Sequence, residues 1–164
     1  MPMDEQKHHS RADETFCQKA LDIALRSLKN GNLPFGCLLV SPEEEVLLEA
    51  ENTVVSSADR INHCEINLVH GFAGKFDFEF LHNCVVYAST EPCPMCTAAL
   101  FWSGVGRLVY AVSKEGYKKA SGDDNPVYNF PVSSKELLAK AGRNVMVTGP
   151  VLEAKGMAFY QSLR

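Results

Sequence analysis

The sequence lacks any long apolar run, and this absence narrows the class of protein. No stretch of its 164 residues approaches the roughly 18 apolar residues that suggest a membrane-spanning helix. The polar start, MPMDEQKHHSRADE, has no apolar core of the kind that secretory signals carry. We therefore expect a cytoplasmic protein with no membrane partner.

An excess of basic charge is also missing. Sixteen Lys and Arg residues stand against twenty Asp and Glu residues, a formal net charge of −4, which argues against a protein that mainly binds nucleic-acid phosphates. Basic residues become more frequent after residue 106, so a locally basic surface stays open. With no repeats or low-complexity tracts, we expect a flexible segment over 1–12 and a single domain over 13–164.

Hydrophobic periodicity predicts alternating helices and strands. Helices are expected over 13–30, 64–74, 94–104 and 151–164, and strands over 35–41, 45–52, 83–89, 107–113 and 144–149. The first two strands form a hairpin, whereas residues 114–134 are loop-rich. The later alternation of strand and helix implies parallel neighbouring strands with right-handed crossovers, and hence an α/β sheet covered by helices.

Six cysteines are present, and in a reducing compartment they are more often buried, metal-bound or catalytic than paired as disulfides. Cys93 and Cys96, in EPCPMC, lie at the start of a predicted helix and share one face of it. Pro94 suits the first helical turn, and the helix dipole favours thiolates there. By itself this motif fits a redox pair, a disulfide or half of a metal site.

The motif HCE at 63–65 favours the metal interpretation. It begins the preceding helix, and two helices that follow adjacent strands would direct their N-termini to one crevice at the carboxyl edge of the sheet. A thioredoxin-like redox pair would not require such a His-x-Glu. His63, Cys93 and Cys96 supply three nitrogen or sulfur donors, which suit a tetrahedral Zn²⁺ ion with its fourth position open to water.

Three ligands indicate a catalytic zinc ion, one per chain, more readily than a structural one. A fourth ligand is hard to find: His70 lies about 10 Å farther along a helix, Cys64 points away from His63, and Cys84 lies at the other end of its strand. Glu65 is poorly placed as a ligand but well placed as a general acid and base. The non-enzymatic alternative is a zinc-stapled binding module, in which Glu65 is a solvated helix charge.

These motifs resemble a known superfamily. HCE and PCPMC are similar to the H-x-E…P-C-x-x-C signature of the zinc nucleobase deaminases. LPFGCLLV resembles the first strand of that family, AEN places an Asn eleven residues before the zinc His, and TEPCPMCTAALFWSGVGRLVYA resembles the branch of guanine deaminases and tRNA adenosine deaminases. The resemblance implies a cytidine deaminase-like fold, a three-layer α/β/α sandwich with a five-stranded mixed sheet whose last two strands are parallel, usually as a homodimer.

The resemblance also implies a role for each matching residue. Zinc ligands would be His63, Cys93 and Cys96, the proton shuttle Glu65, the base-recognising amide Asn52, and the ring that packs on the base Phe35. Zinc-bound hydroxide would attack the amino-bearing ring carbon, and ammonia would leave. Without the resemblance, Asn52 is equally a turn residue and Phe35 an ordinary core residue.

Three departures from the family pattern affect the pocket. Cys64 stands where a small residue usually separates His from Glu, Cys37 follows PFG where alanine is common, and DRINHCE lacks the frequent proline after the aspartate. These differences leave the chemistry intact and make the substrate less certain from the motif alone.

The segment SGDDNP at 121–126 bears on the base. It follows the last core strand, where guanine-deaminating members carry an acidic residue that reads the purine, and Asp124, or less well Asp123, matches it. A carboxylate can accept hydrogen bonds from the guanine N1–H and 2-amino groups together. Gly122 replaces the family's Phe, and the same residues form an ordinary turn elsewhere. Guanine is favoured, and guanosine is not distinguished from it.

Other substrates stay open. A tRNA adenosine deaminase must bind an RNA loop, which the acidic balance disfavours. Five basic residues could still bind RNA phosphates and leave that alternative open: Lys114, Lys118, Lys119, Lys140 and Arg143. Cytosine, a pterin or a triazine are further alternatives.

Overall fold

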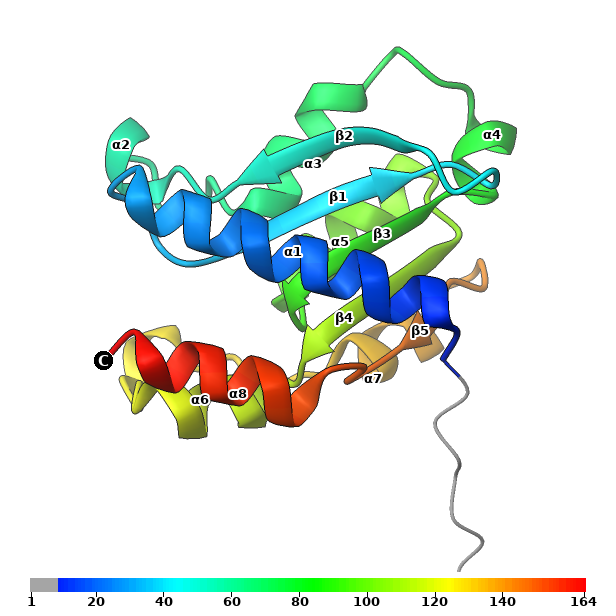
Figure 1. Ribbon diagram of the computed structural model, residues 1–164. Helices are drawn as coiled ribbons and strands as arrows, with labels where there is room; N and C mark the ends of the chain where they lie inside the picture. Colours follow the sequence, from blue (N-terminus) through cyan, green and yellow to red (C-terminus); the bar gives the residue numbers. More distant parts are fainter. Residues whose placement is uncertain (1–8) are drawn as a thin grey trace, which may run out of the picture.

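The structure, a computed structural model, describes residues 9–164 (Figure 1). Its elements, in chain order, are α1 (Arg11–Lys29), β1 (Gly36–Val40), β2 (Val46–Glu51), α2 (Val54–Ser57), α3 (Cys64–Phe72), α4 (Phe78–His82), β3 (Val85–Thr90), α5 (Pro94–Ser103), β4 (Arg107–Val112), α6 (Lys114–Ser121), the 3₁₀ helix η1 (Pro126–Tyr128), α7 (Ser134–Ala139), β5 (Met146–Thr148) and α8 (Glu153–Ser162). The predicted flexible segment 1–12 lies outside the described residues as far as residue 8. Helix α1 begins at Arg11, two residues before the predicted start of the domain. The division into a flexible segment and a single domain stays a prediction.

One mixed sheet of five strands, in the order β2-β1-β3-β4-β5, forms the middle of the molecule. β1 pairs antiparallel with both β2 and β3, whereas β3, β4 and β5 are mutually parallel. The predicted hairpin and the parallel last strands are confirmed. The expectation that consecutive strands of the later alternation are parallel neighbours is wrong for the pair β2 and β3, because β1 lies between them.

Helices cover both faces of this sheet, as Figure 1 shows for α1 in front of the strands and α3 and α5 behind them. Alternate residues of β1 enter two separate hydrophobic clusters. Leu38 and Val40 join the cluster with α1 and α8, while Cys37 and Leu39 join the cluster with α3 and α5. Since side chains of a strand alternate between faces, a strand buried on both faces is apolar throughout, as β1 is. The three-layer α/β/α architecture is confirmed.

Gly36 allows α1 to approach the start of β1 closely. A Cβ atom at this position would lie 2.6 Å from the backbone nitrogen of Ala24, a contact that would force the backbone to move. The glycine therefore fixes the height of β1 against the helix, and with it the position of the neighbouring Phe35.

Asp13 ties α1 to the sheet. Its carboxylate accepts two hydrogen bonds from Arg107 of β4, at 3.0 and 2.8 Å, and one from the Tyr87 hydroxyl of β3 at 2.8 Å. The same side chain completes a capping box with Ser10 at the helix N-terminus. These four hydrogen bonds replace the solvation that the Asp13 carboxylate loses on burial.

The prediction that 114–134 is loop-rich is wrong for its first part. Residues Lys114–Ser121 form α6, because Ser113 caps the helix by accepting a hydrogen bond from Gly116, and Ala120 is buried against the α8 side of the core. The short helices α2, α4, η1 and α7 were also not predicted, since one or two turns leave little periodic signal. Among the described helices, none combines the length and the apolar content needed to cross a bilayer.

Candidate metal centre and active site

The N-termini of α3 and α5 meet at one edge of the sheet. His63 is the N-cap residue of α3 and Cys93 the N-cap residue of α5, and neither side chain caps its own helix. Cys96 lies one turn into α5, with Pro94 in the first turn as the sequence predicts. β2 and β3 are not neighbours, but each is antiparallel to β1, so they run in the same direction. The helices that follow them therefore begin at the same edge of the sheet.

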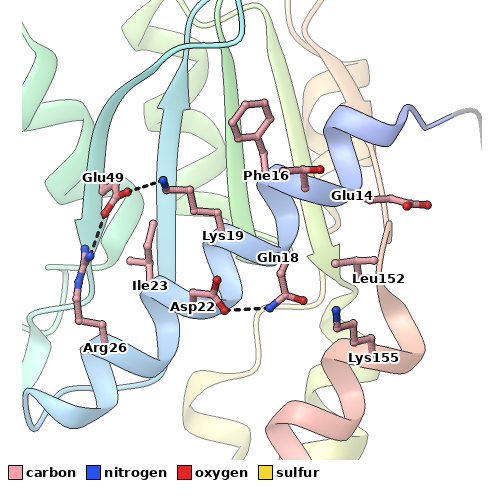
Figure 2. Close-up of a pocket in the computed structure, with 11 residues that line it drawn as sticks. Glu14, Phe16, Gln18, Lys19, Asp22, Ile23, Arg26, Glu49, Leu152 and Lys155 are labelled. Carbon is pink, nitrogen blue, oxygen red and sulfur yellow. Dashed lines mark hydrogen bonds and ion pairs between the residues drawn. The ribbon is translucent and has the colours of Figure 1, made fainter.

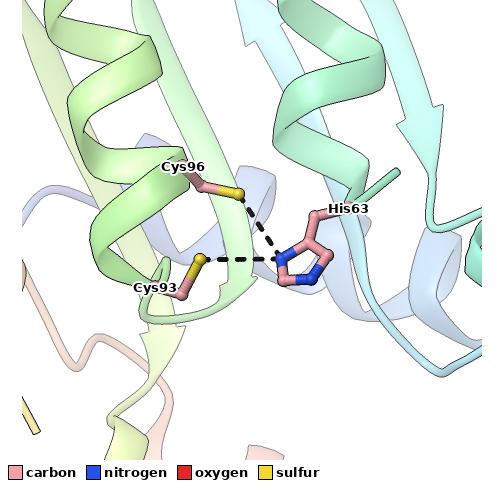
Figure 3. Close-up of side chains that lie close together, drawn as sticks. All are labelled: His63, Cys93 and Cys96. Atoms are coloured by element: carbon pink, nitrogen blue, oxygen red, sulfur yellow. Dashed lines mark hydrogen bonds between the residues drawn. The ribbon is translucent and has the colours of Figure 1, made fainter. Parts of the chain in front are cut away.

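Both cysteine sulfurs converge on one nitrogen atom (Figure 3). Cys93 Sγ lies 3.6 Å and Cys96 Sγ 3.5 Å from Nδ1 of His63, and all three donor atoms lie within 4.8 Å of one another. Ligand distances of about 2.3 Å for Zn–S and 2.0–2.1 Å for Zn–N place sulfur and nitrogen about 3.6 Å apart around one tetrahedral ion. These three donors therefore fit a zinc ion, and the predicted triad is brought together.

Hydrogen bonding between the two cysteines prepares one of them as a thiolate. The Cys96 thiol and the His63 ring stabilise the charged form of Cys93, which lowers the pKa of Cys93 to about 4 although burial opposes the shift. The same bond from Cys93, together with burial, raises the pKa of Cys96. The Cys93 thiolate raises the pKa of His63. Thiolate is the form that binds metal, so the site favours a cation in the space between these donors.

Glu65 lies buried beside the triad, with only 6% of its surface exposed. Burial raises the pKa of its carboxyl, and the negative charge of Cys93 raises it further. The thiols of Cys64 and Cys96 lie close enough to this carboxyl to affect its proton equilibrium or to be affected by it. A solvated helix charge, the alternative for this residue, is excluded by its burial. A carboxyl with a raised pKa next to a metal site is suited to accept and donate protons.

Phe35 and Asn52 lie together at the open end of the β1–β2 hairpin. The backbone N–H of Asn52 donates to the carbonyl of Phe35 at 3.1 Å, beside the pair Gly36 and Glu51 of the strand register. Asn52 is buried, and its Oδ1 accepts a hydrogen bond from the Val54 N–H, which is the turn geometry that an Asn after a strand favours. Its Nδ2 donor has no protein partner among residues 9–164, so the amide can still donate to a ligand.

Two tyrosine rings pack against Phe35 and form an aromatic cluster with it. Its ring centroid lies 5.1 Å from that of Tyr117 in α6 and 6.3 Å from that of Tyr160 in α8, and these two tyrosines contact each other edge to face. The Tyr160 hydroxyl donates to the Pro34 carbonyl at 3.0 Å. Helix α8 thus supports Phe35 within its own chain. Sequence reasoning missed both tyrosines, because 126 residues separate Tyr160 from Pro34 and no local pattern links them.

Asp123 and Asp124 lie on the exposed loop that follows α6. Gly122 ends that helix in a left-handed conformation, and Asp123 Oδ1 accepts a hydrogen bond from the N–H of Asn125. The charge of Asp123 is close enough to Tyr117 to contribute to that residue's raised pKa, whose main cause is burial. The loop therefore begins next to the aromatic cluster under Phe35, while both carboxylates remain accessible to a ligand.

The remaining cysteines are neutral and enclosed. Cys37 and Cys64 are in mutual hydrogen-bond contact, and burial raises the pKa of both thiols. Cys17 and Cys84 lie in the core clusters, and no disulfide forms between any of the six. The two positions that depart from the family pattern, Cys37 and Cys64, thus adjoin each other beneath the site.

A hollow between α1, β2 and α8 lies apart from the triad (Figure 2). It lies on the α1 face of the sheet and is lined largely by charged and polar side chains of α1. Several of these already pair: Glu49 accepts from Arg26 at 2.9 Å and from Lys19 at 3.4 Å, and Gln18 donates to Asp22. None of the predicted site residues lines it.

Comparison with known families identifies the family of this chain. The model of the cytidine and deoxycytidylate deaminase zinc-binding region matches residues 10–112, which include the triad and Glu65. This chain belongs to that deaminase family. The family is a zinc-binding one, as the sequence predicted, and the matched residues include the triad, whose donors could hold the ion.

Characterised and probable deaminases with different substrates are similar to this deaminase. A probable cytosine deaminase of Schizosaccharomyces pombe is 33% identical over 88% of this chain and 87% of its own. A guanine deaminase of Bacillus subtilis is 30% identical over 70% of this chain and 74% of its own. A tRNA-specific adenosine deaminase of Haemophilus influenzae is 32% identical over 68% of this chain and 64% of its own. The family is thus shown, and the substrate differs among relatives.

Solved structures support the fold. A guanine deaminase from Nitrosomonas europaea superposes with a TM-score of 0.74 at 24% identity, covering 91% of this deaminase and 82% of that chain. Because 91% of the chain is covered, the likeness extends beyond residue 112, where the family model ends.

Proposed function

We propose that this protein is a zinc-dependent hydrolytic deaminase of a nucleobase or nucleoside, with guanine as the favoured substrate. The observation that carries the proposal is the convergence of the His63, Cys93 and Cys96 donors beside the buried carboxyl of Glu65. A binding module stapled by zinc would have no use for a buried proton-carrying group beside its three ligands.

The reaction converts the amino-bearing ring carbon to a carbonyl with water and releases ammonia. A zinc ion held by the triad would supply a Lewis acid that makes a water molecule nucleophilic at neutral pH. Glu65 would accept a proton from water and deliver it to a ring nitrogen of the base. Its raised pKa favours both transfers, since a carboxyl of ordinary pKa holds its proton too weakly at neutral pH.

The other site residues would bind the base. Nδ2 of Asn52 can donate to a ring nitrogen or carbonyl of the substrate, while its Oδ1 is occupied by Val54 and keeps the amide oriented. Phe35 would pack on the ring plane. Both interactions are available to purines and pyrimidines alike, so they do not by themselves select a base.

Guanine is favoured by the exposed acidic loop. Asp124, or Asp123, can accept hydrogen bonds from the N1–H and 2-amino groups of guanine, which adenine and cytosine do not present in this arrangement. The likeness to guanine deaminases of Bacillus subtilis and Nitrosomonas europaea agrees with this choice. Cytosine is the second candidate, because the Schizosaccharomyces pombe relative has the higher identity and covers more of the chain.

A tRNA substrate has less support. Of the five basic residues that kept this alternative, two are engaged within the fold: Lys114 Nζ donates to the Val132 carbonyl at 2.7 Å, and Arg143 donates to the Val105 carbonyl at 2.9 Å. These cations serve the fold rather than a phosphate backbone, and the formal net charge is −4.

An ammonia-release panel tests the proposal. The zinc-loaded protein is incubated with guanine, guanosine, adenine, cytosine, cytidine, pterin, a triazine and a tRNA anticodon stem-loop. We expect the highest kcat/KM with guanine. Higher kcat/KM with cytosine would select the second candidate, and turnover of the stem-loop alone would refute the small-molecule proposal.

A substitution in the acidic loop tests whether Asp124 recognises guanine. Asp124→Asn removes the acceptor charge and leaves an exposed side chain of equal size, so folding should be unaffected. We expect kcat/KM for guanine to fall about ten- to a hundredfold, the effect of losing a charge-assisted hydrogen bond. Asp123→Asn tests the alternative acceptor at the neighbouring position. Full guanine activity in both variants would show that neither carboxylate recognises the base.

We further propose that the protein acts as a cytoplasmic homodimer. Met95 and Trp102 lie two turns apart on one face of α5, and Trp102 is 82% exposed. A second copy that covers this face would remove a large apolar surface from water. The six free thiols suit a reducing compartment. Light scattering should give twice the 18.1 kDa chain mass, and Trp102→Glu should give the monomer.

A further inference from the structure

Glu91 is a buried charged residue that the proposed chemistry does not use. It follows β3 and precedes the Pro92–Cys93 turn that carries a zinc ligand. The residue is 8% exposed, and its carboxylate accepts hydrogen bonds from the backbone N–H of Ser134 at 2.9 Å and of Lys114 at 3.3 Å. Its own N–H donates to the Val112 carbonyl at 2.8 Å.

The two donors are the first residues of two different helices. Lys114 begins α6 and Ser134 begins α7. The first N–H groups of a helix have no partner within the helix, and this end carries a partial positive charge. One carboxylate at the end of β3 therefore accepts one N–H group from each of two helix N-termini and places negative charge beside both.

Hydroxyl groups attach the metal-ligand turn to α7 as well. The Pro92 carbonyl accepts hydrogen bonds from Thr97 Oγ1 and from Ser134 Oγ, each at 3.3 Å, and the two hydroxyl oxygens lie 2.9 Å apart. Pro92, Thr97 and Ser134 are all buried. The turn that places Cys93 is thus fixed to the start of α7 by both Glu91 and Pro92.

The chain between these two helices carries the proposed base-reading residues. Asp123 and Asp124 lie between α6 and α7, and Tyr117 of α6 packs on Phe35. Glu91 is attached to both ends of this segment. Because its main chain also leads directly into Cys93, a displacement of Glu91 would shift the substrate-contacting side chains relative to the zinc ligands.

We propose that Glu91 is a positioning residue, which holds segment 114–134 in register with the metal ligands so that the base is bound at the correct height over the zinc site. This role rests on the proposed deaminase function. It does not require Glu91 to touch the substrate or the metal. Glutamate suits the position because its two oxygens can serve two N–H donors, whereas the amide of glutamine would direct an N–H group at one of them.

Hydrogen–deuterium exchange tests the attachment without using activity. In the zinc-loaded protein, Glu91→Gln should increase exchange at the start of both α6 and α7. Glu136→Gln is the matched control, since the Glu136 carboxylate also serves the N-terminus of α7, accepting from Ser133 at 2.8 Å, but does not contact the metal-ligand turn. The control should increase exchange in α7 alone.

Kinetics test the positioning. For guanine, or the base that the panel selects, Glu91→Gln should raise KM at least about tenfold, the effect of weakening a hydrogen bond to a charged group. Its kcat should stay within about threefold, and its zinc content at one ion per chain. Glu136→Gln should leave KM unchanged. Unaltered exchange in α6, an unaltered KM, or a loss of zinc in parallel with kcat would each overturn the proposal.

The positioning role of Glu91 and the deaminase function can be refuted independently of each other. Wild-type protein that releases no ammonia from any substrate refutes the deaminase, while the exchange pattern still decides whether Glu91 fastens both helices. If Glu91→Gln does not fold, Glu91→Asp takes its place, because the charge is kept but the shorter side chain cannot reach both N–H groups. If neither variant folds, Glu91 is a stability residue and positioning is refuted.

Discussion

At the scale of single residues, burial decides what Glu65 can do. The carboxyl is removed from water and lies near the Cys93 thiolate, and both effects raise its pKa. An exposed glutamate at the same place in the sequence would be ionised at neutral pH and would release no proton to a base. Its neighbours in HCE differ in role. His63 occupies the N-cap position of α3 but turns its side chain to the cysteines, while Cys64 enters the core.

Glu65→Gln should separate metal binding from catalysis. The amide has the size of the carboxyl but cannot carry a proton between water and the base, so we expect one zinc ion per chain and a loss of kcat of about 10²- to 10⁴-fold. Metal analysis and ammonia release measure the two properties. Glu79→Gln, on the exposed side of α4, is the control and should keep full activity. An active Glu65→Gln enzyme would contradict the assigned role.

At the scale of elements, the buried group formed by Asp13, Tyr87 and Arg107 joins α1 to two strands. Burial acts to raise the pKa of Asp13, but the hydrogen bonds from Arg107, Ser10 and Tyr87 outweigh it, so the pKa of this carboxyl lies below its ordinary value. A lowered folded-state pKa means that the charged carboxylate stabilises the native state.

Asp13→Asn should therefore destabilise the protein in a pH-dependent manner. The free energy of unfolding at pH 7 should fall by about 3 kcal/mol, since the change leaves Arg107 without its partner. The stabilisation is complete above the unfolded-state pKa of about 3.9 and is lost as the pH falls through the lower folded-state value. Urea unfolding of both proteins from pH 7 to pH 3 should show the difference shrinking only below about pH 4. A difference independent of pH would refute the charge-based account.

At the scale of the whole molecule, the metal site connects the two long helices of one layer. His63 and Cys96, 33 residues apart in the chain, come from α3 and α5, which pack side by side over the sheet. A zinc ion bound only by the native arrangement would stabilise the entire fold by mass action.

Removal of zinc should lower the midpoint of thermal unfolding. Dialysis against a strong chelator such as dipicolinate should reduce Tm by about 5–10 °C, a shift that matches a few kcal/mol of binding energy for a domain of this size. Readdition of zinc should restore both Tm and activity, and magnesium, which prefers oxygen ligands, should restore neither. An unchanged Tm would show that the ion contributes nothing to folding.

Local sequence determined much of this protein. The apolar periodicity of α1, the β-type runs of β1 to β4, and Pro94 and Gly104 at the two ends of α5 are short-range signals, and each was read correctly. The zinc triad could be inferred because its ligands stand in two compact motifs at helix N-termini. The family pattern then supplied candidates for base binding, of which Phe35 and Asn52 prove to be neighbours.

Only the tertiary structure decided how these parts are joined. Insertion of β1 between β2 and β3, the contact of Tyr160 with Pro34 across 126 residues, and the attachment of α6 and α7 to Glu91 depend on pairing between distant segments. Such contacts leave no periodic trace, since a side chain that serves a distant backbone group needs only to be polar at one position. The sequence thus determined which groups could do the chemistry, and long-range packing decided their spacing.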